Sequence, residues 1–172
     1  MRIQRNKPTK SADKSPIYAS AIRRKFEEVI KADPKRIEEF IKAFTFRKVL
    51  DSLKGKSIQV QLEAVLKLCE TLRDAYRKLP IKKENSTNPL DSPEWNKCFY
   101  YNSVLINMKS VFQDPNQIES NLIKAAKSVN LEDEMKKSLG LGRNPVALGL
   151  WISEEIVTFK TSEQIQNQPT LF

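Results

Sequence analysis

The sequence contains no histidine, and only four glycines and two cysteines among its 172 residues. The missing histidine excludes the side chain that proteins use most often for acid–base chemistry near neutral pH, along with His-containing triads and most zinc sites. Cys69 and Cys98 lie far apart within apolar stretches and form no CxxC pair, so we expect reduced thiols in an intracellular protein. We therefore expect no catalytic site, no metal and no cofactor.

Long apolar runs are also missing. No stretch approaches the ~20 residues of a membrane span. Residues 1–10 are polar and basic, without the apolar segment of a signal peptide. These absences predict a soluble, cytoplasmic protein without a membrane partner. Hydrophobic residues make up 40% of the chain, which is enough for the core of a single domain of this length.

Positive charge is concentrated at one end of the chain. Residues 1–56 hold sixteen Lys and Arg against seven Asp and Glu, an excess of nine, whereas residues 57–172 hold fourteen of each sign. A local excess of this kind attracts phosphate groups and releases counterions on contact. It indicates a nucleic-acid partner, and the alternative is a solvated helix face with a basic tail.

The basic residues recur at intervals of one to two helical turns, so that a subset can line one side of a two-helix surface. The candidate nucleic-acid-binding residues are Arg23, Arg24, Lys31, Lys35, Arg36, Arg47 and Lys48. For any one of them, pairing with a neighbouring glutamate is an equally open interpretation. Reversal of Arg23, Arg24 and Lys31 to glutamate is expected to weaken strand binding without changing the helical circular dichroism.

Proline placement predicts the architecture. Five prolines follow a good N-cap residue, which is typical of helix starts: Ser15-Pro16, Asp33-Pro34, Ser92-Pro93, Asp114-Pro115 and Asn144-Pro145. Alternation of apolar and polar residues over a strand length is missing, so we expect no sheet. The sequence predicts an all-α single bundle of about six to seven helices.

The expected helices cover 16–32, 34–54, 57–79, 93–113, 115–129, 131–139 and 145–159. The second of these either breaks near Thr45 or buries both faces. The expected organisation is a basic flexible arm at 1–14, a bundle at 15–160 with halves 15–80 and 92–160 joined by a surface loop at 81–91, and a flexible tail at 161–172.

Two features allow a binding role beside a structural one. Trp95, Phe99, Tyr100 and Tyr101 can stack on bases, but the helix that carries them is apolar nearly all round, which favours core packing. The turn at 140–145 places glycines and an arginine before a helix start, where ordinary capping is favoured over an anion site.

Two stretches prompt a resemblance to a known family: residues 14–22 leading to Ala32-Asp33-Pro34, and residues 144–152 in the last helix. With its size, helical content and charge, the chain resembles the small subunit of CRISPR effector (Cascade-like) complexes, especially of types I-D and I-B. These subunits correspond to the C-terminal helical part of the large subunit. The resemblance carries over no signature residue.

The resemblance implies a non-catalytic subunit in several copies, beside other subunits of an effector ribonucleoprotein. Such a subunit holds the target strand or the displaced non-target strand, as single-stranded DNA or RNA, through phosphate contacts. Two alternatives remain. One is a helical protein-interaction adaptor that uses apolar surface around 95–112 or 151–159, and the other is a stand-alone DNA-binding regulator, although no clear helix-turn-helix is seen.

Overall fold

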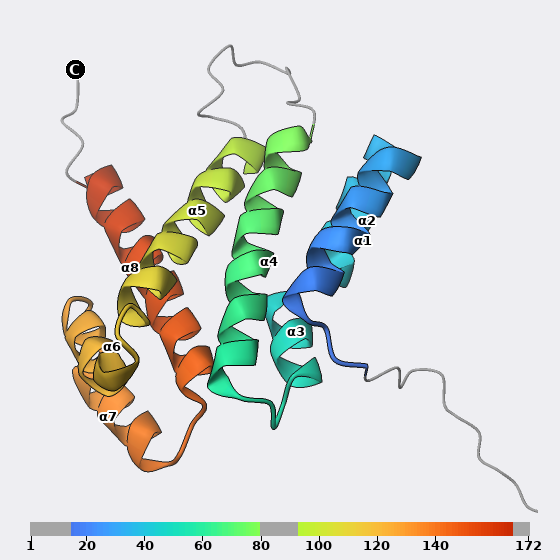
Figure 1. Ribbon diagram of the computed structural model, residues 1–172. Coiled ribbons are helices and arrows are strands. Elements are labelled where there is room, and N and C mark those ends of the chain that lie inside the picture. The colour runs from blue at the N-terminus through green and yellow to red at the C-terminus, as the bar shows by residue number, and fades with distance from the viewer. Residues whose placement is uncertain (1–14, 80–92, 167–172) are drawn as a thin grey trace, which may run out of the picture.

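The computed structural model describes residues 15–79 and 93–166. Within these ranges the chain forms eight α-helices and two short 3-10 turns with no strand, which confirms the all-α prediction and adds one helix to the expected number (Figure 1). The predicted arm at 1–14 and loop at 81–91 lie outside the described residues.

The extra helix comes from a break at Thr45. Here α1 (Ala19–Ala32) is followed by a 3-10 turn, η2 (Pro34–Arg36), then by α2 (Ile37–Ala43) and α3 (Phe46–Ser52). Phe44 ends α2 in an extended conformation, and the Thr45 hydroxyl accepts a hydrogen bond from the Lys48 backbone N–H at 3.2 Å. Of the two alternatives for this segment, the broken helix is therefore correct.

The predicted helix start at Pro16 is wrong. Tyr18 precedes α1 in an extended conformation, and no side chain caps the helix. The backbone N–H of Ile17 instead donates a hydrogen bond to the Ser52 hydroxyl at 2.9 Å. A contact with the end of α3 therefore overrides the local capping preference of the Ser15-Pro16 pair.

The central element is α4 (Ile58–Lys78), the longest helix predicted with a clean apolar pattern. Ala64, Leu68 and Leu72 pack into one apolar cluster with α1, α2 and α3, whereas Val65 and Cys69 belong to a second cluster with α5 to α8. Both clusters thus share α4, and its closest neighbours are α5 and α1. The expected halves 15–80 and 92–160 are therefore part of one bundle. The boundary between its two apolar clusters runs along α4.

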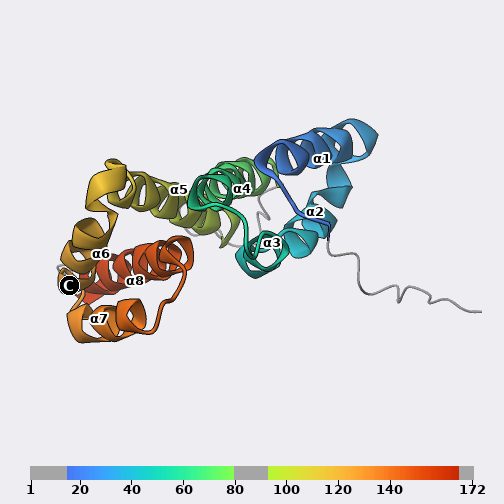
Figure 2. The same ribbon diagram turned by 60° about the horizontal axis from the view of Figure 1, so that its bottom comes forward.

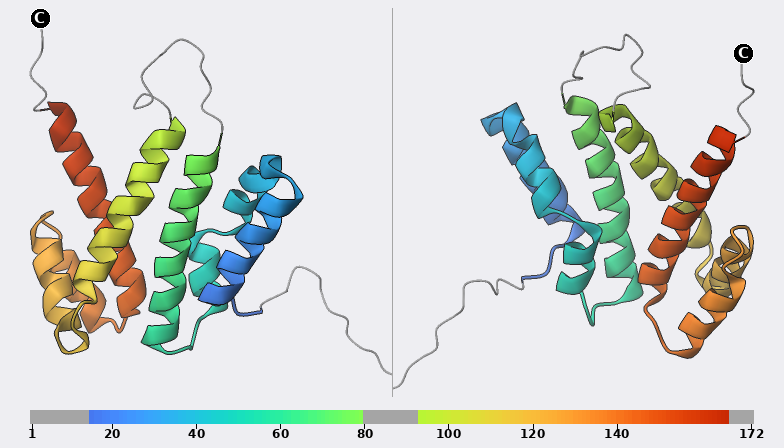
Figure 3. Two further views of the ribbon diagram at one scale, coloured as in Figure 1. Left: turned by 45° about the horizontal axis from the view of Figure 1, so that its top comes forward. Right: turned by 180° about the vertical axis from the view of Figure 1, so that it is seen from behind.

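The second cluster is built from α5 (Pro93–Val111), α6 (Ile118–Lys127), α7 (Glu132–Gly140) and α8 (Pro145–Gln166), with a 3-10 turn, η4 (Pro115–Gln117), before α6. Seen in Figure 2, α1, α4 and α5 form a row, with α2 and α3 against one end and α6, α7 and α8 against the other. The two views of Figure 3 show the same order.

The last helix is longer than predicted. It continues from Pro145 to Gln166, so residues 161–166 extend α8 and the expected tail boundary at 161 is wrong. Its start is as predicted, because the Asn144 side-chain oxygen accepts hydrogen bonds from the backbone N–H groups of Val146 and Ala147 at 2.8 and 3.3 Å. The turn at 140–145 is therefore accounted for by ordinary capping.

A buried glutamine joins the starts of α4 and α8. Gln61 is only 3% exposed, and its amide donates to the Lys56 carbonyl at 2.8 Å and accepts from the Asn144 side chain at 2.6 Å. Both polar ends of a buried side chain are thus paired, as burial requires. This link fixes the end of the bundle at which α8 begins.

Candidate nucleic-acid interface

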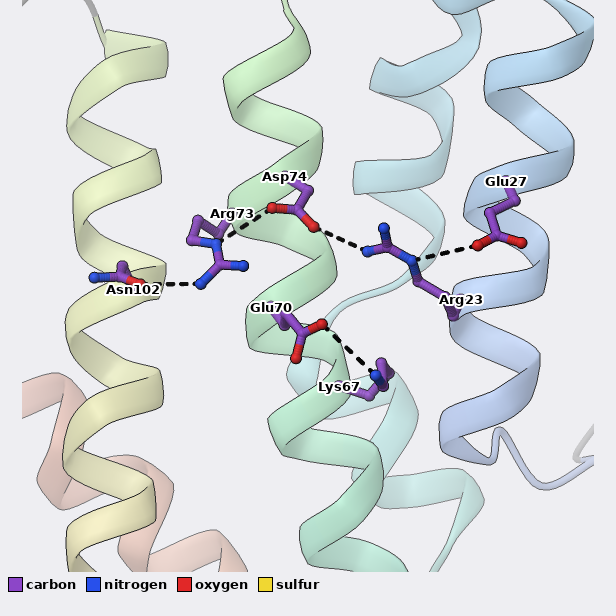
Figure 4. A network of polar contacts seen from close by, with 7 residues as sticks. All are labelled: Arg23, Glu27, Lys67, Glu70, Arg73, Asp74 and Asn102. Carbon is purple, nitrogen blue, oxygen red and sulfur yellow. Dashed lines mark hydrogen bonds and ion pairs between the residues drawn. The ribbon is translucent and has the colours of Figure 1, made fainter.

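Arg23, one of the predicted cations, turns toward the bundle. Its Nη1 donates to the Asp74 carboxylate of α4 at 2.9 Å, and its Nε lies 3.6 Å from Glu27 (Figure 4). Asp74 also pairs with Arg73 at 3.3 Å, and Arg73 reaches Asn102 of α5 at 3.1 Å. These contacts link α1, α4 and α5. The Arg23 side chain therefore contributes to the packing of the bundle.

Two further candidates have acidic partners on the surface. Arg36 lies 3.2 Å from Glu39, and Arg47 lies 3.9 Å from Asp51. All four side chains are more than half exposed, and exposed pairs of this kind contribute less than about 1 kcal/mol. A phosphate can therefore compete with these carboxylates, but the local charge is already balanced.

The next three candidates lie on α1 and in η2. Arg24 and Lys31 are exposed and lie two helical turns apart on the same side of α1, and Lys35 follows in η2. None of the three has an ion-pair partner among the residues that the structure describes. We call Arg24, Lys31 and Lys35 the α1 group.

Lys48, the last candidate, lies at a different place. It occupies the first turn of α3, and its Nζ donates to the Lys42 carbonyl at 3.5 Å. Lys42, Lys54 and Lys56 are likewise exposed and have no ion pair within the described ranges. We call Lys42, Lys48, Lys54 and Lys56 the α3 group.

Three of these lysines were missed by the sequence analysis. Lys42, Lys54 and Lys56 do not belong to any run of basic residues, and their only signal is the overall excess of charge in residues 1–56. The described chain also begins beside this group, because Ile17 contacts the end of α3. Residues 1–14, which hold five Lys and Arg against one Asp, precede this point in the sequence.

The seven candidates do not form one patch. Lys31 and Lys35 lie where α1 meets η2, while α3 lies near the beginning of α1 (Figure 1). A helix of 14 residues is about 21 Å long, and most of this length separates Lys31 and Lys35 from the α3 group, whereas Arg24 lies in the second turn of α1. A strand that contacts both groups must run along α1, over a distance that several nucleotides span.

The aromatic candidates divide between the interior and the surface. The Tyr101 ring stacks on Tyr76 with 5.7 Å between centroids and lies 5.8 Å from Phe46. The Tyr100 hydroxyl donates to the Glu154 carboxylate of α8 at 2.6 Å. Burial, together with this hydrogen bond, raises the pKa of Tyr100 above its ordinary value. These two tyrosines therefore belong to the packing of the bundle.

Phe99 is different, because 53% of it is exposed to solvent. Core packing was the favoured prediction for this side chain, and it is wrong. The apolar pattern of α5 runs nearly all round the helix, but only one side of α5 packs against α4, α6 and α8. The sequence does not show which part of such a helix is left uncovered.

The two cysteines are both buried and free. Burial, with a smaller contribution from the nearby Glu154 carboxylate, raises the pKa of the Cys69 thiol. A raised pKa keeps the sulfur protonated and unreactive.

Within the ranges that the structure covers, no helix is long and apolar enough to cross a membrane.

Comparisons with known proteins were made with protein-family models, with curated proteins and with solved structures. They find no match. The function is therefore argued from the charges and surfaces of this chain itself.

Proposed function

We propose that the protein is a non-catalytic, cytoplasmic subunit that holds a single strand of DNA or RNA through phosphate contacts to the α1 group and the α3 group. The observation that carries this proposal is the α1 group, three exposed cations on α1 and in η2 that form no ion pair with any residue the structure describes. Unpaired cations release the counterions of a phosphate backbone without first breaking an ion pair.

The assembly that we propose is a CRISPR interference complex, in which the protein is the small subunit, present in several copies beside other protein subunits. Its all-α fold, size and local basic surface support this assignment. In such a complex guide pairing selects the sequence, so the subunit needs contacts that tolerate any base. Lysine and arginine contacts to phosphates meet that requirement.

The test is binding of the purified full-length protein to labelled random single strands and duplexes, titrated with salt. The variant carries Arg24→Glu, Lys31→Glu and Lys35→Glu. The control carries Lys124→Glu, Lys127→Glu and Lys137→Glu, three exposed lysines of α6 and α7, so both variants change net charge equally. Arg23 is left unchanged because a glutamate there would face Asp74 and Glu27 and destabilise the fold.

We expect salt-sensitive binding by the wild-type protein. Loss of three phosphate contacts is expected to reduce the slope of log K against log salt by about 2, since each contact to a single strand contributes ~0.7. The control variant is expected to keep most of the slope. Helical circular dichroism checks that both variants remain folded.

Three results contradict the proposal. No binding at low salt removes the nucleic-acid function, and equal losses in the two variants remove the assignment to the α1 group. Sequence-specific protection of a duplex indicates a DNA-binding regulator instead.

The second candidate function is a protein-interaction adaptor, which the exposed side of α5 favours. Phe99 and Ile106 are 53% and 57% exposed on this helix, far more than expected for a buried element. An adaptor would show protein association that does not depend on salt, and no affinity for nucleic acid.

A further inference from the structure

Tyr18, the residue that precedes α1, has 41% of its surface exposed to solvent. Its backbone is extended, and the neighbouring Ile17 packs against the apolar cluster that α1 to α4 share. Successive side chains of an extended segment point to opposite sides, so the Tyr18 ring is directed away from this cluster.

The Tyr18 side chain makes no polar or aromatic contact with any residue that the structure describes. Its ring forms no aromatic pair and no cation–π contact there, and its hydroxyl forms no hydrogen bond. Tyr76, Tyr100 and Tyr101, by contrast, have ring or hydroxyl partners within the bundle. The exposed part of the Tyr18 ring is thus available to a ligand.

Tyr18 lies between the two groups of cations. The backbone N–H of Ile17 bonds to Ser52 at the end of α3, and Lys54 of the α3 group follows two residues later (Figure 1). In the other direction, Arg24 begins the α1 group about 9 Å further along the helix axis. A strand that contacts both groups therefore passes Tyr18.

The nearby carboxylates are balanced by cations of their own. Asp51 of α3 lies 3.9 Å from Arg47, and Glu27 of α1 lies 3.6 Å from Arg23. The α3 group and Arg24 form no ion pair with any described residue. An aromatic ring among such cations matches a nucleotide, which carries an uncharged flat base beside a charged phosphate.

We propose that Tyr18 is the base-stacking residue of the strand-binding surface. A base of the bound single strand stacks on the ring, while phosphates on either side of it contact Lys54 and Arg24. The inference rests on the proposed function and adds to it a contact with a base. Every base has a flat aromatic face, so stacking tolerates any sequence, as guide-directed binding requires.

Stacking on Tyr18 also distinguishes single strands from duplexes. The bases of a duplex are paired and stacked on one another, whereas an unpaired base can turn its face toward a protein ring. Lysine and arginine contacts to phosphates do not make this distinction. Tyr18 therefore gives the surface its preference for single strands.

The first experiment measures binding of the full-length protein to labelled random single strands and duplexes over a range of salt concentrations. Tyr18→Ala removes the ring, and Tyr18→Phe keeps it. The matched control is Phe159→Ala, because Phe159 is 39% exposed and lies on α8, at the other end of the row of helices from α1 (Figure 2).

We expect Tyr18→Ala to weaken single-strand binding about 5- to 100-fold at every salt concentration. The slope of log K against log salt is expected to stay unchanged, since the ring carries no charge. Duplex binding is expected to change little. Tyr18→Phe and Phe159→Ala are expected to keep the affinity of the wild-type protein for single strands.

The second experiment detects stacking directly. Tyr18→Trp places a fluorescent ring at the site, and stacking of a base on an indole quenches its emission. We expect a saturable decrease in fluorescence when unlabelled single strand is added. The wild-type protein, whose Trp95 and Trp151 are half-buried, provides the background signal.

The possible results separate this inference from the proposed function. No binding by the wild-type protein at low salt removes both. Salt-sensitive binding that is equally strong in Tyr18→Ala overturns stacking alone and leaves the phosphate contacts in place. Equal losses on single strands and duplexes, or no quenching of Tyr18→Trp at saturation, also overturn stacking. Circular dichroism and thermal unfolding check that each variant keeps the wild-type fold.

Discussion

Arg23 of α1 and Asp74 of α4 form a hydrogen-bonded ion pair across the bundle, with 2.9 Å between Nη1 and Oδ2. The side chain of Asp74 is 19% exposed and that of Arg23 is 35% exposed, so solvent screens the pair only in part. Arg73 extends the contact to α5 through Asn102. One carboxylate thus helps to hold three helices in place, and its arginine partner is not available to a ligand.

The first prediction concerns this pair. Arg23→Ala and Asp74→Ala are each expected to lower the free energy of unfolding by about 1–2 kcal/mol, with a coupling energy on the order of 1 kcal/mol in a double-mutant cycle. Urea denaturation measures all four proteins. Arg24→Ala, at an exposed neighbour, is expected to change stability by less than about 0.5 kcal/mol. Absence of coupling would show that the pair does not stabilise the fold.

The second prediction concerns the contact of α8 with Phe112. A Cβ atom added at Gly149 would lie 2.6 Å from the Phe112 ring, closer than packing allows. Gly149→Ala is therefore expected to destabilise the protein by about 1–3 kcal/mol. Gly140→Ala, in a helix with open space around the site, is expected to be neutral or to stabilise by up to about 1 kcal/mol. Thermal unfolding of both variants checks the sign of each change.

The third prediction is a pH dependence. Burial and the hydrogen bond to Glu154 raise the pKa of Tyr100 above its ordinary value of 10.0, so the folded protein keeps a proton that the unfolded chain gives up. The resulting stability is complete below about pH 10 and is lost as the pH rises above it. Tyr100→Phe cannot ionise and is expected to flatten this loss.

The loss is not abolished in Tyr100→Phe, because the pKa of Tyr76 and that of Tyr101 are raised as well, chiefly by burial. At neutral pH the variant is expected to be about 1–2 kcal/mol less stable, since the Glu154 carboxylate loses a donor. Denaturant titrations between pH 7 and 11 measure the difference in stability at neutral pH and the loss of stability at high pH. An identical pH profile for the two proteins would contradict the prediction.

The fourth prediction concerns thiol reactivity. Cys69 is fully buried, and burial raises the pKa of its thiol, so we expect no reaction with a thiol reagent while the protein is folded. In denaturant both cysteines are expected to react. Labelling of Cys69 under native conditions, at a rate well above that of global unfolding, would contradict its placement. Mass spectrometry distinguishes it from Cys98.

Local features of the fold were readable from the sequence. The Asn144-Pro145 pair predicted a helix start correctly because an N-cap side chain bonds to the helix that it precedes. The span of α4 was predicted from an apolar pattern that continues from Ile58 to Tyr76 between Ser57 and Pro80. In both cases the deciding interactions join residues a few positions apart.

Other features of the fold were decided by contacts between residues far apart in the sequence. Ser15-Pro16 has the same pattern as Asn144-Pro145, yet the chain stays extended there because Ile17 bonds to Ser52, far along the sequence. Phe99 was assigned to the core because its helix is apolar all round, but its neighbours leave that side of α5 uncovered. The local sequence indicates neither the Ile17–Ser52 contact nor the exposure of Phe99.

The sequence alone determined that this protein is all-α and that its net positive charge comes from residues 1–56, because helix capping, periodicity and charge are properties of neighbouring residues. Only the tertiary structure decided that Arg23 pairs with Asp74, that Arg24 and Lys31 form no ion pair with any described residue, and that Phe99 faces outward. The physical reason is that helical residues one position apart point about 100° apart. Which of them meets a carboxylate, the core or solvent depends on the helix packed beside them.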